Sequence, residues 1–85
     1  MAYKVLIKPS ASKNLDALPD KEVKKILYHI SQLKEEPRPV GVQKLTNVEG
    51  YRIRSGYYRI LYEIDEKSKT VLIYRVKNRK DVYKK

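Results

Sequence analysis

Apolar and polar residues alternate over several short stretches of the 85-residue chain, and two other stretches have the spacing of helices. Residues 3–8 predict a first strand, which Pro9 ends. Ser10 is a candidate N-cap for a short helix that Pro19 breaks. A second helix is expected from about residue 19 to about residue 36. Its apolar stripe, at a period of 3.6 residues, consists of Val23, Ile26, Leu27, Ile30 and Leu33.

Residues 51–62 have the pattern of a β-hairpin. Two runs rich in Ile and Tyr flank Ser55 and Gly56, a turn pair in which glycine can adopt a positive φ without steric cost. Because side chains alternate along a strand, Arg52 and Arg54 point away from the apolar side of the first run. Arg59 points away from the apolar side of the second run. One hairpin can therefore be anchored by an apolar surface and still present three guanidinium groups.

The connector, the last strand and the order of the elements together predict the fold class. A Pro/Gly-containing connector over residues 37–45 is expected to lie on the surface. After a turn at residues 65–68, a last strand from Thr70 to about Val76 is apolar on both faces near its start, which is typical of a central strand. The order predicts an α+β fold: a mostly antiparallel four-stranded sheet with the helix pair packed on one face. No repeat or boundary interrupts it, so residues 1–85 are expected to form one domain.

The charge distribution indicates an acidic partner. The formal net charge is +10, and residues 51–85 carry eleven basic and four acidic side chains, a net of +7. Five of the six arginines lie there, and a guanidinium fork can hold a phosphate through two hydrogen bonds. Nucleic acid, an anionic membrane surface and an acidic protein all fit such a chain. Cysteine is absent, and we expect no signal peptide and no membrane span.

Several conventional catalytic arrangements are missing. The one histidine, His29, lies in the middle of the second predicted helix with no partner in the local sequence, and we interpret it as a partly exposed helix residue. The carboxylates are few and scattered, so the sequence predicts no metal site. A Gly-rich phosphate loop and a nucleophile elbow are also lacking. We therefore expect no cofactor.

The aromatic residues are eight tyrosines, with no Phe or Trp. Single-stranded RNA is typically held by a basic groove with aromatic platforms on which bases stack. Tyr57 and Tyr58 are interpreted as residues of ordinary sheet packing, because tyrosine is common in strands. Tyr83 follows a basic run beyond the last strand, which makes it the better candidate for an exposed platform.

Such residues could also cleave RNA, because its 2′-hydroxyl can attack the adjacent phosphate without a protein nucleophile. The protein must align the reacting oxygen, stabilise charge on the phosphate and move two protons. The candidates for charge stabilisation are Arg52, Arg54 and Arg59. The candidates for proton transfer are Lys44, Lys77 and Tyr83.

Three segments together carry a resemblance to a known family. They are Lys44-Leu45, residues 50–62 with the pattern YRIR-x-G-x-YRI-x-Y, and residues 78–83 ending in R-K-D-V-Y. This combination resembles the RelE/ParE superfamily of toxins from type II toxin–antitoxin systems, over nearly the whole chain. The resemblance implies the RelE-like microbial RNase fold. It also implies a cognate antitoxin that wraps the toxin, in a complex whose oligomeric state is open.

For the RelE branch, the resemblance implies an mRNA interferase that cuts mRNA in the ribosomal A site, in the cytoplasm. Cleavage would need no metal and would proceed by 2′-hydroxyl attack. The catalytic residues that it implies are Arg52, Arg54, Arg59, Lys77 and Tyr83. The RNA-binding positions added to them are Lys44, Arg75, Arg79 and Lys80. The best-known RelE pattern has lysines at the first two catalytic positions and an arginine at the position of Lys77, which leaves the general base unassigned.

Two other functions fit the same sequence. A ParE-like toxin with this fold would inhibit DNA gyrase by binding it, and ParE-like chains generally lack the full catalytic set. A basic binding module without activity would show an affinity that falls steeply with salt. Fold alone does not decide among the three.

Overall fold

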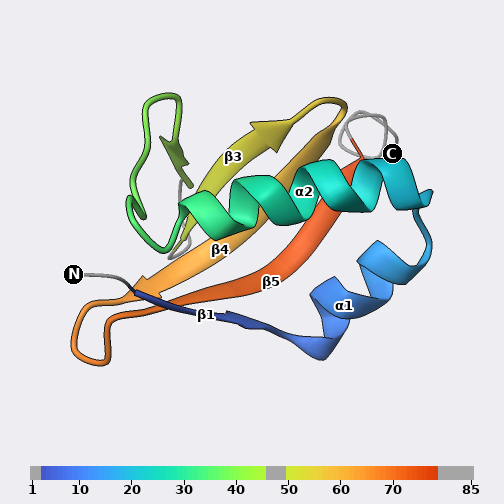
Figure 1. Ribbon diagram of the computed structural model, residues 1–85. Helices are drawn as coiled ribbons and strands as arrows, with labels where there is room; N and C mark the ends of the chain where they lie inside the picture. Colours follow the sequence, from blue (N-terminus) through green and yellow to red (C-terminus); the bar gives the residue numbers. More distant parts are fainter. Residues whose placement is uncertain (1–2, 46–49, 79–85) are drawn as a thin grey trace.

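The computed structural model describes residues 3–45 and 50–78. The elements, labelled in Figure 1, are β1 (Lys4–Ile7), α1 (Pro9–Asp16), α2 (Asp20–Gln32), β2 (Gln43–Lys44), β3 (Tyr51–Ser55), β4 (Tyr58–Asp65) and β5 (Thr70–Asn78). The strands form one sheet in the order β1-β5-β4-β3-β2. The β1–β5 pair is parallel and the other pairs are antiparallel. The predicted α+β fold is confirmed, but the sheet has five strands rather than four, because two connector residues pair with β3.

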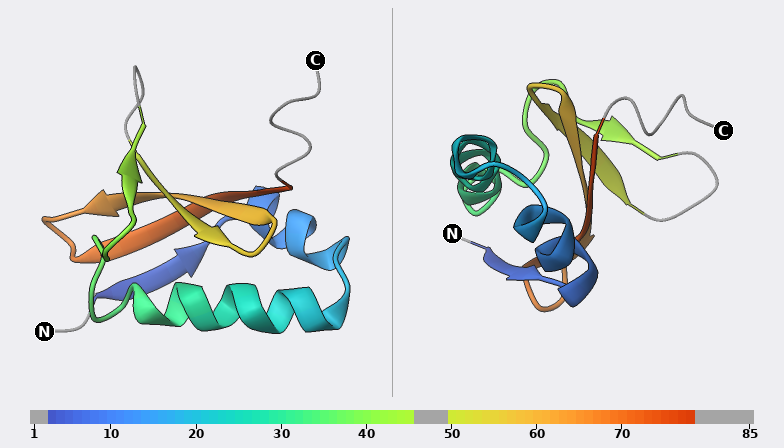
Figure 2. Two further views of the ribbon diagram at one scale, coloured as in Figure 1. Left: turned by 90° about the horizontal axis from the view of Figure 1, so that it is seen from above. Right: turned by 90° about the vertical axis from the view of Figure 1, so that its right-hand side faces the viewer.

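Both helices lie on one face of the sheet, as the two views of Figure 2 show. This arrangement buries the apolar stripe of α2 against the inward-facing residues of β3, β4 and β5. Leu27 lies at the margin of the stripe and stays exposed. None of the helices in the described ranges is long and apolar enough to cross a membrane. The buried core consists of Ala11, Leu15, Ile26, Ile30, Leu33, Ile53, Ile60, Tyr62, Val71, Ile73 and Val76.

Helix α1 has no side-chain cap at its N-terminus, and two of its polar side chains form hydrogen bonds with the backbone of β5. It begins at Pro9, whose missing N–H costs nothing in the first turn, and Lys8 is the N-cap residue. Ser10 therefore lies inside the helix, and the prediction that it caps the helix is wrong. Its hydroxyl instead donates to the carbonyl of Tyr74 (2.7 Å), and Oδ1 of Asn14 accepts from the backbone N–H of Val76 (3.0 Å).

Helix α2 ends at Gln32, four residues before the predicted end. Its last turn tightens, because the N–H of Leu33 bonds to the carbonyl three residues earlier. The chain is then held against the sheet by the buried phenol of Tyr62, whose Oη donates to the carbonyl of Pro37 at 2.6 Å. Tyr62 itself is fully buried in the core.

The hairpin of β3 and β4 is confirmed, with its turn one residue later than predicted. Ser55 pairs with Tyr58, so the two turn residues are Gly56 and Tyr57. Gly56 has a φ of +61°, the left-handed value that a primed hairpin turn needs at this position. Ser55 therefore becomes a buried strand residue, and Tyr57 is placed at the exposed tip.

A bulge in β5 decides which way the cations of this strand face. Leu61 of β4 pairs with Arg75 and Tyr62 pairs with Ile73, so Tyr74 has no partner on β4. The extra residue reverses the alternation of side chains. Ile73 and Val76 both face the core, and Arg75 and the residue two positions later face away from it. As predicted, β5 is a central strand, but it extends to residue 78.

Candidate functional site

Arg54, Arg59 and Lys77 stand in one row across β3, β4 and β5. Arg54 pairs with Arg59, and Arg59 pairs with Lys77. Residues directly opposite each other share a face of the sheet, and here it is the face away from the helices, because Ile60 next to Arg59 is buried in the core. Lys77 was expected after the last strand, but it lies within β5.

A second row lies beside the first. Arg52 of β3 pairs with Leu61 of β4, which in turn pairs with Arg75 of β5. The two rows place five predicted site residues on one surface, which we call the basic face: Arg52, Arg54, Arg59, Arg75 and Lys77. The sequence predicted the residues, and the bulge at Tyr74 brings the last two of them to the same side as the hairpin arginines.

No residue of the basic face forms an ion pair within the described ranges. The ion pairs formed by residues 3–45 and 50–78 join Arg38 and Lys69 to Glu66, at 2.7 and 3.7 Å, and neither involves the basic face. Arg59 is only 7% exposed and lies between two other cations. Like charges directly opposite each other in a sheet repel. This arrangement therefore favours the binding of an anion.

One member of the basic face is oriented by a neutral partner. Nε of Arg52 donates to Oε1 of Gln43 at 3.1 Å, and Nη2 of the same guanidinium donates to the same oxygen. Gln43 and Arg52 are also directly paired between β2 and β3. The two-residue strand β2, which the sequence pattern did not predict, thus holds the Arg52 side chain in place without neutralising its charge.

The remaining predicted residues lie elsewhere. Lys44 pairs with Tyr51, and because Gln43 lies on the side of Arg52, alternation turns Lys44 toward the opposite side of the sheet. The structure therefore does not bring Lys44 together with the basic face. The roles predicted for Arg79, Lys80 and Tyr83 fall on residues outside the described ranges.

Tyr57 differs from its sequence interpretation. It is 72% exposed at the hairpin tip, so sheet packing does not account for it, whereas Tyr58 packs partly against the core. A small depression there is lined by Arg54, Gly56, Tyr57, Tyr58 and Arg59. The exposed ring of Tyr57 is therefore available beside two arginines of the basic face. The sequence signal for this placement was Gly56, because a glycine at the first position of the turn puts Tyr57 at the second.

Two tyrosines of the sheet, the buried Tyr62 and the partly buried Tyr74, are unsuited to proton abstraction at neutral pH. Burial raises the pKa of the Tyr62 phenol, and the nearby Tyr51 raises it further. Burial also raises the pKa of Tyr74, with Glu63 adding to the effect. Both phenols therefore keep their protons, and Tyr62 uses its own in the hydrogen bond to Pro37.

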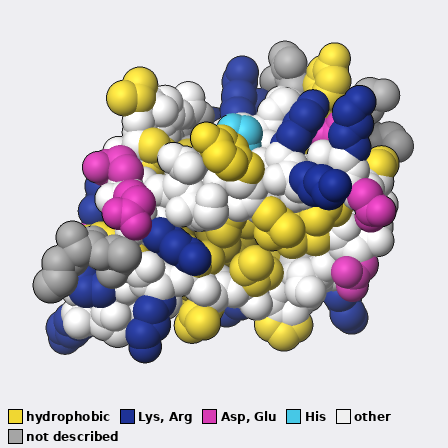
Figure 3. Space-filling model, viewed as in Figure 1, with side chains coloured by type: hydrophobic (Ala, Val, Ile, Leu, Met, Phe, Trp, Pro, Cys, Tyr) yellow, Lys and Arg dark blue, Asp and Glu magenta, His cyan; other side chains and the backbone are white. Residues whose placement is uncertain are grey.

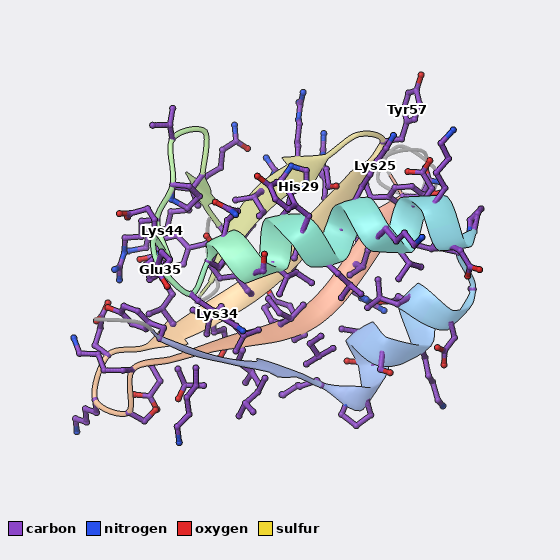
Figure 4. All side chains as sticks on the ribbon, in the orientation of Figure 1. Lys25, His29, Lys34, Glu35, Lys44 and Tyr57 are labelled. Atoms are coloured by element: carbon purple, nitrogen blue, oxygen red, sulfur yellow. The ribbon has the colours of Figure 1, made fainter. Side chains whose placement is uncertain are left out.

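A cavity of about 680 Å³ opens between the end of α2, the connector and β3. Its lining includes Arg52 and Arg54 of the basic face and His29 of α2. His29 was interpreted as a helix residue without a local partner, and its partner is distant in sequence: its Nδ1 lies 2.9 Å from Oγ of Ser55 in a hydrogen bond. Figure 4 shows His29 on the side of α2 next to β3. Sequence reasoning missed this cavity because the path of the connector forms it.

The chain matches known proteins along almost its whole length. The sequence model of the family described as "ParE toxin of type II toxin-antitoxin system, parDE" matches residues 5–83. Toxin RelG of Mycobacterium tuberculosis is 33% identical over 87 residues, covering all of both chains. Two solved structures are also similar. The RelBE2 toxin–antitoxin complex of M. tuberculosis has a TM-score of 0.84 and 29% identity, over 93% of this chain and 100% of that one. The archaeal RelE-RelB complex of Pyrococcus horikoshii OT3 has a TM-score of 0.82 and 33% identity, over 93% and 97%.

The matching family model and the similarity to toxin RelG agree with the fold described above. The chain therefore belongs to the RelE/ParE superfamily, the toxins of type II toxin–antitoxin systems.

Proposed function

We propose that this toxin is a ribosome-dependent mRNA endonuclease that stops translation by cutting mRNA in the ribosomal A site. The observation that carries the proposal is the row of Arg54, Arg59 and Lys77, three cations that form no ion pair in the described part of the chain. A phosphate of RNA is an anion of suitable size and geometry for such a row. The sheet holds the row rigidly, as a catalytic charge cluster requires.

In the proposed reaction, the 2′-oxygen bonds to phosphorus and the bond from phosphorus to the 5′-oxygen of the next nucleotide breaks. The products are a 2′,3′-cyclic phosphate and a 5′-hydroxyl. Arg54 and Arg59 approach the phosphate from facing strands and stabilise the charge that builds on its oxygens. Lys77 at the end of the row and Tyr83 are the proposed groups for taking the 2′-proton and supplying one to the leaving oxygen. No step in this scheme needs a metal ion.

An antitoxin is the proposed protein partner, as in the RelBE2 and RelE-RelB complexes that the fold resembles. Figure 3 shows hydrophobic side chains gathered across the middle of the helix-bearing face. Exposed apolar residues lie on α2 (Leu27 and Tyr28) and on the edge strand β1 (Leu6 and Ile7). We expect an amphipathic, acidic antitoxin segment to cover the helices and this sheet edge. Purified toxin that fails to bind the product of the adjacent gene contradicts this part of the proposal.

A second candidate function follows from the matching family model, whose description names ParE. In this alternative the basic face binds DNA gyrase and cleaves nothing, and the toxin acts in the cytoplasm by causing DNA breaks. A third candidate is a non-catalytic basic module, which binds anions but neither cuts RNA nor breaks DNA.

A cell-free translation reaction separates these functions. Purified full-length toxin is added to an extract that translates one mRNA, and to the same extract with a copy of the mRNA that lacks its start codon. The proposal predicts cuts within the reading frame of the translated mRNA only. Intact mRNA in both reactions contradicts it, and double-strand breaks in DNA supplied with gyrase then identify the ParE-like function.

A further inference from the structure

We propose that the 680 Å³ cavity between α2, the connector and β3 holds one unpaired nucleotide of the bound RNA, next to the nucleotide that is cut. This inference rests on the proposed function for the identity of the RNA. The binding of a nucleotide in the cavity can be measured separately from cleavage.

The cavity is continuous with the basic face. Strand β2 pairs with β3 only at Arg52 and Tyr51, so the outer edge of β3 from Ile53 to Ser55 has no neighbouring strand. Arg54 sits on this open edge and lines both the cavity and the small depression beside Tyr57. An RNA strand whose phosphate lies on Arg54 and Arg59 can therefore pass over the edge of β3 and place its neighbouring base in the cavity.

The polar lining suits the edge of a nucleobase. Besides two arginines, it includes three polar side chains, His29, Gln32 and Gln43. Nδ1 of His29 is bonded to Ser55 and Oε1 of Gln43 is bonded to Arg52, so the other ring nitrogen and the amide NH₂ group can face a ligand. No side-chain hydrogen bond of Gln32 is made within the described ranges. Together these groups can donate to and accept from the pattern on a base edge.

The apolar lining and the charge point to the same ligand. Pro39, Val40 and Ile53 offer apolar surface for the flat face of a base, and Val40 is fully exposed beside the cavity. Arg52 and Arg54 supply cations for a phosphate, and no carboxylate is among the described lining residues. The volume lies within the range of about 300–1,000 Å³ typical of small-molecule sites. The two arginines alone would also attract the carboxylates of an acidic peptide. The neutral amides of Gln32 and Gln43 offer both donors and acceptors, which suits a base better than a carboxylate that only accepts.

The test is a binding titration of the ¹⁵N-labelled full-length chain, followed by NMR. The probes are the four ribonucleoside 5′-monophosphates, ribose 5-phosphate, which lacks a base, and a short acidic peptide. We expect at least one nucleotide to shift the backbone amides of Gly41 and Ile53 and the side-chain amide of Gln32, with saturation. Ribose 5-phosphate should bind at least about 5-fold more weakly and leave Gly41 unshifted, because it lacks the base contacts.

Two variants of α2 sharpen the test. Gln32→Ala removes a polar group of the cavity at an exposed helix position, and should weaken nucleotide binding by about 2- to 10-fold with no effect on ribose 5-phosphate. Ser31→Ala removes an uncharged polar group from an exposed neighbouring position outside the cavity, and should bind nucleotides as the unmodified chain does. Circular dichroism checks that both variants are folded.

The outcomes distinguish this inference from the proposed function. Nucleotides that leave Gly41 and Gln32 unshifted overturn the inference, as does ribose 5-phosphate that binds equally tightly, or an acidic peptide that shifts these signals when nucleotides do not. Cleavage of translated mRNA in any of those cases leaves the proposed function standing. Nucleotide binding in the cavity by a chain that cuts no mRNA supports the site and counts against the proposed function.

Discussion

Arg54 of β3 and Arg59 of β4 stand directly opposite each other on the helix-free face of the sheet, and Arg59 is almost buried. Two facing guanidinium groups repel each other, and neither forms an ion pair with a carboxylate of the described residues. We therefore expect the pair to reduce the stability of the free toxin. An anion between the two side chains would convert this repulsion into attraction, so stability and function should respond to Arg59 in opposite directions.

Replacing Arg59 by methionine should make the free toxin more stable and inactive. Arg59→Met keeps the bulk of the side chain and removes a cation that faces two others, which should raise the free energy of unfolding by about 1 kcal/mol. For a chain of this length the midpoint temperature should rise by roughly 4–8 °C. Thermal and urea unfolding measure the change. Arg38→Met is the matched control, because Arg38 has a partner in Glu66 and should lose stability instead. A stability loss in Arg59→Met would contradict the assignment of unrelieved repulsion.

Sulfate should stabilise the toxin through the basic face. A ligand that binds only the folded state stabilises it by about 1.4 kcal/mol at ten times its dissociation constant. We expect sulfate to raise the midpoint temperature above that in chloride at equal ionic strength, and we expect Arg59→Met to lose most of this difference. Equal responses of the two proteins would show that the anion binds elsewhere.

Tyr62→Phe should destabilise the fold, because the buried carbonyl of Pro37 loses its hydrogen bond. The expected loss in the free energy of unfolding is about 1–3 kcal/mol, measured by urea unfolding at neutral pH. Tyr57→Phe is the control, since the exposed ring of Tyr57 should change stability by less than about 0.5 kcal/mol.

The same variant should change the response to alkali. Burial raises the pKa of Tyr62 above its value of about 10 in the unfolded chain; Tyr51 and Glu36 also raise it, and Arg38 lowers it. The stabilisation linked to the proton is therefore complete below pH 10 and is lost as pH rises toward the folded pKa. Between pH 9 and pH 11, Tyr62→Phe should lose less stability than the unmodified toxin. Parallel losses would show that Tyr62 ionises equally in both states.

Gly50→Ala should be more damaging than Gly56→Ala. Gly50 has a φ of +137°, and a Cβ there would lie 3.1 Å from the carbonyl oxygen of Tyr62 and from Oη of Tyr74. Gly56 has a φ of +61° and open space around it. We expect a loss in the free energy of unfolding of about 1 kcal/mol at Gly56, and of about 3 kcal/mol or more at Gly50. Equal losses, measured by urea unfolding, would contradict the close contact.

The sequence predicted the elements that depend on local pattern. Period-2 alternation identified the hairpin and the side of Arg52, Arg54 and Arg59, and the apolar run after Thr70 identified the central strand. It did not predict the bulge at Tyr74, because a bulge breaks the alternation on which the prediction rests. Without the bulge, Lys77 would have been placed on the core side.

Features set by long-range contacts were also missed. The bond between His29 and Ser55 joins residues 26 positions apart, and the cavity beside it depends on where the connector returns to the sheet. Ser10 fits the pattern of an N-cap, but it serves a tertiary contact with β5. In each case the local sequence allows several roles for a side chain, and contacts with residues distant in sequence decide which role it takes.

Primer extension on mRNA after induced expression of the toxin tests the central claim most directly. The unmodified toxin and Arg59→Met are expressed to equal levels, and the 5′ ends of one translated transcript and of its copy without a start codon are mapped. We predict new ends within the reading frame only for the unmodified toxin and the translated transcript. Growth arrest with intact transcripts, or equal cutting by Arg59→Met, would contradict RNA cleavage by the basic face.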